Sequence, residues 1–107
     1  MRICFFGESF VNGTGDPECL GWAGRICAAA CQQGYDITYY NLGIRRETTS
    51  ELKDRWLQES ACRLPEFDSR IVFSFGVNDT TPPIWGLGGG SSVIWLNLIT
   101  CVYTVEN

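Results

Sequence analysis

Three short stretches of strand-forming residues, each leading directly into a glycine-containing loop, constrain the fold of this 107-residue chain most strongly. They cover residues 3–6, 36–42 and 71–75. Short, mainly apolar runs of this kind are typical of strands that are buried on both faces of a parallel sheet. The sequence therefore predicts three buried strands.

Two segments with helical spacing of apolar residues separate these strands. The first covers residues 19–33, and Gly34 follows it as a plausible C-cap. The second covers residues 49–63, and either Thr48 or Thr49 can cap its amino end. We therefore expect one helix in each of the two connections between strands.

The order strand, helix, strand, helix, strand defines the expected fold class. Parallel strands need a crossover connection, which is usually a helix, so this alternation favours parallel pairing in an α/β protein. Because such crossovers are right-handed, the three strands should lie in the order 2-1-3 with helices packed on the sheet.

The polar loops after the three strands should meet at one edge of this sheet. The carboxyl ends of parallel strands share an edge, and α/β proteins bind their ligands there. The loops begin with the sequences Gly7-Glu8-Ser9, Asn41-Leu42-Gly43 and Gly76-Val77-Asn78-Asp79. This edge is the expected functional site.

In this order, each directly after a predicted strand, the three loop sequences resemble the first three sequence blocks of the GDSL/SGNH hydrolases. The resemblance covers residues 2–81 and corresponds to the N-terminal half of the family fold. It implies a three-layer α/β/α, flavodoxin-like architecture, truncated after the third parallel strand. It also implies a serine ester hydrolase that acts on a small ester or lipid-like substrate and needs no cofactor.

The resemblance assigns a role to one residue of each loop. Ser9 would be the nucleophile, and its backbone N–H would be one donor of the oxyanion hole. The backbone N–H of Gly43 and the side-chain amide of Asn78 would be the other two donors. These roles are chemically reasonable, because the carbonyl oxygen of an attacked ester gains negative charge and needs donors that already point at it.

The chain departs from the family pattern in two respects. Glu8 stands where the family usually has aspartate, and the extra methylene changes how the loop is braced. The family's general base is a histidine in a late Asp-x-x-His block, and these 107 residues contain no histidine. Glu8 and Asp79, taken as exposed carboxylates, are poor substitutes for that base. We therefore expect an inactive or impaired enzyme.

Other interpretations of the same residues remain open. Ser9 can be an ordinary N-cap, Gly43 a turn residue, and Asn78 part of a turn or cap. The whole chain can be a non-catalytic remnant or a binding module. It can also be a flavodoxin-like phosphate or nucleotide binder that uses the loop of residues 7–15, although that loop contains no basic residue.

The composition changes after Asp79. Residues 80–105 carry no charged side chain, and residues 93–105 are apolar and rich in β-branched types. We expect a partial hydrolase domain over residues 1–81. Residues 82–107 would then be an uncharged Gly/Ser-rich and apolar tail outside the parent fold. The alternative is an additional strand that pairs beside the third.

Charge and cysteine content restrict the partners. The net charge of −4 argues against nucleic acid as a partner. The six cysteines are irregularly spaced, without a CxxC pair or histidine, so we expect reduced thiols and no metal. We see neither a secretory signal nor the roughly 20 apolar residues of a membrane span, which favours a cytoplasmic protein. The oligomeric state stays open.

Overall fold

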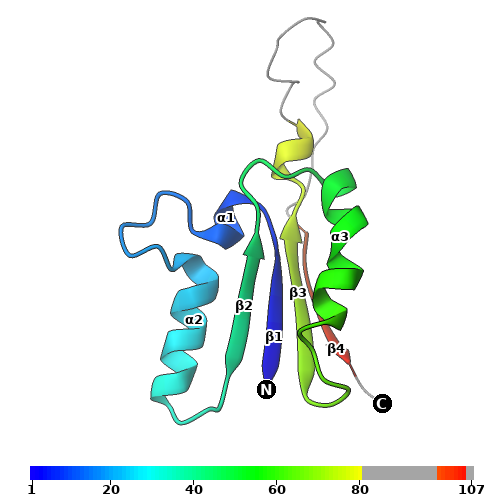
Figure 1. Cartoon of the computed structure of the whole chain (residues 1–107). Coiled ribbons are helices and arrows are strands. Elements are labelled where there is room, and N and C mark those ends of the chain that lie inside the picture. Colours follow the sequence, from blue (N-terminus) through cyan, green and yellow to red (C-terminus); the bar gives the residue numbers. More distant parts are fainter. Residues whose placement is uncertain (81–98, 106–107) are drawn as a thin grey trace, which may run out of the picture.

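The computed structural model describes residues 1–80 and 99–105, which form one sheet with helices packed on it (Figure 1). Strand β1 lies between β2 and β3 and is parallel to both, so the predicted order 2-1-3 is confirmed. The bounds are β1 Arg2–Gly7, β2 Thr38–Gly43, β3 Ser69–Phe75 and β4 Ile99–Val105.

Strand β4 is antiparallel and pairs with the outer side of β3. It pairs along the whole length of β3, from Ser69 opposite Val105 to Phe75 opposite Ile99. This placement corresponds to the alternative interpretation of the tail as an additional strand beside the third. Residues 82–98 lie outside the described residues, and the domain boundary after residue 81 stays a prediction.

Both predicted helices are present, with shorter bounds. The first is α2, Gly21–Gln32, and the second is α3, Thr49–Ala61. Thr48, not Thr49, is the N-cap of α3: its side chain accepts the Glu51 N–H, and the Glu51 side chain accepts the Thr48 N–H. This reciprocal capping box satisfies two backbone donors that the helix leaves without partners.

Two clusters of buried side chains lie on opposite faces of the sheet, because successive strand residues point to opposite sides. Phe5 of β1 belongs to the cluster that includes Ala23 and Cys27 of α2. Its neighbours Cys4 and Phe6 belong to the other cluster, together with Leu52 of α3. The sheet is therefore the middle of three layers, and the predicted α/β/α, flavodoxin-like architecture is confirmed.

Two further short helices were not expected from the sequence. They are α1, Ser9–Asn12, directly after β1, and the 3₁₀ helix η1, Val77–Thr80, after β3. Each has four residues, which is too few for a periodic pattern of apolar positions. Both contain residues of the predicted site.

Candidate active site

The predicted site residues follow strand ends that lie at the same level of the sheet. Gly7, the last residue of β1, is paired with Gly43 of β2 on one side and with Ser74 of β3 on the other. As a result α1, the connection from β2 to α3, and η1 leave the sheet at the same edge (Figure 1). This arrangement is the one that the three loop sequences predicted.

Ser9 is the first residue of α1 and lies directly after a tight turn out of β1. The turn requires glycine at position 7, because a Cβ atom there would lie 2.1 Å from the carbonyl oxygen of Ser74. Glu8 is the N-cap of α1. Its Oε2 atom accepts hydrogen bonds from the Ser9 hydroxyl at 3.0 Å and from the Phe10 N–H at 3.3 Å. The hydroxyl proton of Ser9 therefore points at a carboxylate.

The expectation that Glu8 is exposed is wrong, because its side chain turns back to cap α1 and is fully buried (0% exposed). Asp79 is partly buried. The second carboxylate oxygen of Glu8, Oε1, has no hydrogen-bond partner within the described part of the chain. Glu8 also places negative charge at the amino end of α1, where a phosphate group would have to bind, and so counts against the phosphate-binding interpretation.

Gly43 packs directly against the segment that contains Ser9. A Cβ atom at position 43 would lie 2.5 Å from the backbone nitrogen of Asn12 and 2.8 Å from the carbonyl oxygen of Glu8. Its carbonyl accepts a hydrogen bond from the Asn12 side chain at 3.3 Å. The absence of a side chain thus allows the end of β2 to approach the backbone of α1 closely. The Gly43 N–H donates to Oδ1 of Asn41 at 3.1 Å.

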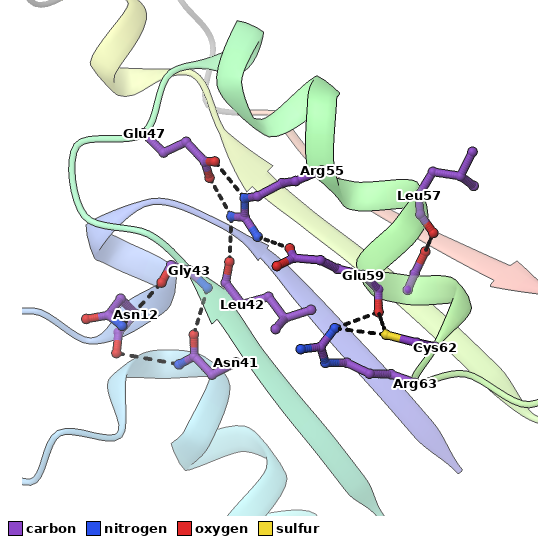
Figure 2. A network of polar contacts seen from close by, with 11 residues as sticks. Asn12, Asn41, Leu42, Gly43, Glu47, Arg55, Leu57, Glu59, Cys62 and Arg63 are labelled. Atoms are coloured by element: carbon purple, nitrogen blue, oxygen red, sulfur yellow. Dashed lines mark hydrogen bonds and ion pairs between the residues drawn. The ribbon is translucent and has the colours of Figure 1, made fainter.

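Asn41 joins the end of β2 to α1, a role that the sequence did not indicate (Figure 2). While its Oδ1 accepts from Gly43, its Nδ2 donates to the carbonyl of Val11 at 2.8 Å. That carbonyl is one of those that a helix leaves without an internal partner at its carboxyl end. The available signal was the spacing of two residues, which places Asn41 and Gly43 on the same side of the strand.

Asn78 follows β3 at this edge, in η1, but its hydrogen bond is not to the Ser9 loop. Its side-chain amide donates to the backbone carbonyl of Glu47 at 2.9 Å. Glu47 belongs to the connection between Gly43 and α3, so the amide is fastened to the loop that follows Gly43. The mutual placement of Ser9, Gly43 and Asn78 as one oxyanion hole stays a prediction.

Asp79 attaches the same 3₁₀ helix to the start of α3. One carboxylate oxygen accepts the backbone N–H of Thr49 at 2.8 Å, and the other accepts its hydroxyl. A negative charge at the amino end of a helix is favourable because of the helix dipole. Asp79 therefore acts in this structure as a tether between η1 and α3.

A half-buried arginine on α3 holds the connection between β2 and α3 (Figure 2). The guanidinium of Arg55 binds both carboxylate oxygens of Glu47, with 2.6 Å between Nε and Oε1. It also donates to Glu59 at 2.5 Å and to the carbonyl of Leu42 at 2.6 Å, and it lies 5.5 Å from the centre of the Phe6 ring. No pattern in the sequence indicated this network, because Glu47 and Leu42 are distant from Arg55 along the chain.

The surroundings of the ionisable groups shift several pKa values. Burial alone would lower the pKa of Arg55, but its hydrogen bonds to Glu47 and Glu59 and the charge attraction of both groups together outweigh this effect and raise it. Burial raises the pKa of the Cys4 thiol to about 11, and burial also raises the pKa of Cys27. Arg55 is therefore charged throughout the ordinary pH range, while these two thiols are poor nucleophiles.

Among residues 1–80 and the strand 99–105, no group of three or more His, Cys, Asp or Glu side chains is placed to hold a metal ion. None of the helices in the described ranges has the length and apolar character needed to cross a membrane.

Three parallel strands with these loops at their shared carboxyl edge define an α/β protein. The sequence model of the GDSL-like Lipase/Acylhydrolase family matches residues 5–99, and the chain belongs to this family. The resemblance inferred from the three loop sequences is confirmed. The match includes the three loops and extends beyond residue 81, where the resemblance was expected to end, to the first residue of β4. A search of curated proteins found no match.

Proposed function

We propose that the chain is a serine ester hydrolase of the GDSL type, with Ser9 as its nucleophile. The backbone N–H groups of Ser9 and Gly43 and the side-chain amide of Asn78 form the oxyanion hole. The substrate is a small ester or a lipid-like ester. Attack by Ser9 Oγ on the acyl carbon gives an acyl-serine, and water releases the acid in a second step.

The observation that carries this proposal is the close approach of Gly43 to the backbone of α1. The approach leaves no space for a Cβ atom and brings the end of β2 against the segment that begins with Ser9. Ser9 occupies the first position of α1, where a backbone N–H finds no acceptor inside the helix. The Gly43 N–H is bonded to a neutral amide oxygen, which a negatively charged substrate oxygen can replace as a stronger acceptor.

The activity of these 107 residues alone should be close to the uncatalysed rate. A serine hydroxyl needs an adjacent base to become a good nucleophile, and the chain contains no histidine. Glu8 accepts a hydrogen bond from the Ser9 hydroxyl, but a carboxylate is a weaker general base than the imidazole of histidine. With a short-chain activated ester, Ser9→Ala should therefore change the rate little.

Added imidazole gives a positive test, because it can take the place of the absent base. The exposed thiols are first blocked, since they can also attack the ester; they include Cys19, Cys31 and Cys62. Imidazole also hydrolyses the ester in solution, and the rate with Ser9→Ala measures this background. We expect the rate with the unaltered chain and imidazole to exceed that background.

Ser50→Ala is the matched control, because Ser50 is an exposed serine in the first turn of α3. It should retain the full imidazole-dependent increment. Equal increments in the unaltered chain and in Ser9→Ala would contradict Ser9 as the nucleophile. Strong turnover without imidazole that Ser9→Ala abolishes would contradict the impaired state, because it requires another base.

A further inference from the structure

The guanidinium of Arg55 contacts groups that hold two of the three proposed oxyanion donors, the Gly43 N–H and the Asn78 amide. Arg55 donates to the carbonyl oxygen of Leu42 at 2.6 Å. That carbonyl belongs to the same peptide unit as the N–H of Gly43. Because a peptide unit is planar, fixing its C=O also fixes the direction of its N–H. A charged donor on the C=O also polarises the peptide and strengthens the N–H as a donor.

The second connection runs through Glu47. Its carboxylate is held by Arg55 in a bidentate ion pair, and only 6% of the residue is exposed. Its backbone carbonyl accepts the side-chain amide of Asn78 at 2.9 Å. The pair therefore fixes the residue to which the third donor is bound. A paired arginine and carboxylate with this fork geometry is the kind that restricts orientation most strongly.

We propose that Arg55 is a positioning residue of the oxyanion hole, because it holds the Leu42–Gly43 peptide directly and Asn78 through Glu47. This inference rests on the proposed function. Arg55 does not contact these donors directly. The Ser9 hydroxyl donates to Glu8, and the Asn78 side chain donates to the carbonyl of Glu47. The third partner of Arg55, Glu59, lies one turn further along α3 and anchors the guanidinium to its own helix.

Arg55→Lys is the informative substitution, because lysine keeps the charge but cannot bind Glu47, Glu59 and the Leu42 carbonyl in one planar fork. Hydrogen exchange of backbone amides, followed by NMR, reports how often each segment opens. The amide of Phe5, in the central strand, serves as the reference for opening of the whole sheet. We expect Gly43 to exchange at least about tenfold faster relative to Phe5, since a hydrogen bond from a charged group is lost.

Arg63→Lys is the matched control, because Arg63 is an arginine that directly follows the C-cap residue of α3. Arg63 is partly buried and binds the carbonyl of Glu59 and the face of Tyr40, but neither Leu42 nor Glu47. Arg63→Lys should leave the ratio of the amide exchange rates of Gly43 and Phe5 unchanged. Glu47→Gln gives a second, milder variant, which keeps the contact between Arg55 and Leu42. It should shift the side-chain amide signals of Asn78 while sparing the exchange of Gly43.

The imidazole-dependent rate completes the test. Arg55→Lys should reduce the increment, whereas Arg63→Lys should not. An unchanged Gly43-to-Phe5 ratio in a folded Arg55→Lys variant, or an equal change in Arg63→Lys, would overturn the positioning role. Absence of the imidazole-dependent increment in the unaltered chain would instead contradict the proposed function. The hydrogen-exchange rates are measured without substrate, so they test the positioning role separately.

Discussion

Gly43→Ala places a methyl group where two backbone atoms already lie. The new Cβ would be 2.5 Å from the nitrogen of Asn12 and 2.8 Å from the carbonyl oxygen of Glu8. Neither atom belongs to a flexible side chain, so the end of β2 and the segment of α1 must move apart. Overpacking of this kind typically costs about 1–3 kcal/mol, and two backbone contacts favour the upper half of that range. A loss of about 2–3 kcal/mol is a large part of the stability of a typical domain, about 5–15 kcal/mol.

Urea unfolding followed by far-ultraviolet circular dichroism measures this loss through the free energy of unfolding extrapolated to water. Ile44→Ala is the control, because Ile44 is the next residue and is 47% exposed. It should change the free energy by less than about 0.5 kcal/mol. If Gly43→Ala changed it no more than Ile44→Ala, the close packing of β2 on α1 would be refuted.

Three other outcomes are expected. Leu52→Ala should cost about 2–5 kcal/mol in the same assay, because the side chain is 3% exposed in the cluster under α3. Mass spectrometry after alkylation near pH ~8 should find Cys4, whose pKa burial raises to about 11, modified much more slowly than exposed Cys19. The hydrogen bond from Arg25 lowers the pKa of Asp16 from 3.8 to about 2. The stabilisation that ionised Asp16 contributes is therefore fully present above pH 3.8 and is lost as the pH falls through about 2. Asp16→Asn should remove this part of the pH dependence of the free energy of unfolding.

The sequence predicted the three parallel strands and their order because each run was short and largely apolar, and a helical segment separated each run from the next. It did not predict α1 or η1, since four residues show no period. Thr48 and Thr49 were both left open as caps, although the spacing of Glu51 three residues after Thr48 is the capping-box pattern that the structure has. The local patterns were therefore sufficient for the three parallel strands and the two longer helices, but not for the two shortest elements.

The surroundings of the site residues were harder to predict than their identities. Glu8 is a charged residue in a glycine-rich loop, and charged residues are usually exposed. Its complete burial is a property of the folded chain that no local pattern specifies. The partners of Arg55 were unpredictable for the same reason. Leu42 and Glu47 precede Arg55 by 13 and 8 residues and contact it only in the folded chain.

The register that brings the three strand ends to one level is preserved by selection for folding as well as by selection for activity. Gly7 is paired with Gly43 and Ser74, so a slip of one residue in β2 or β3 would displace one loop by about 3.3 Å. The same slip would turn every side chain of that strand to the opposite face, away from the side chains that it packs against. Selection for a folded protein alone thus preserves the alignment of the three loops, even in descendants that gain nothing from hydrolysis.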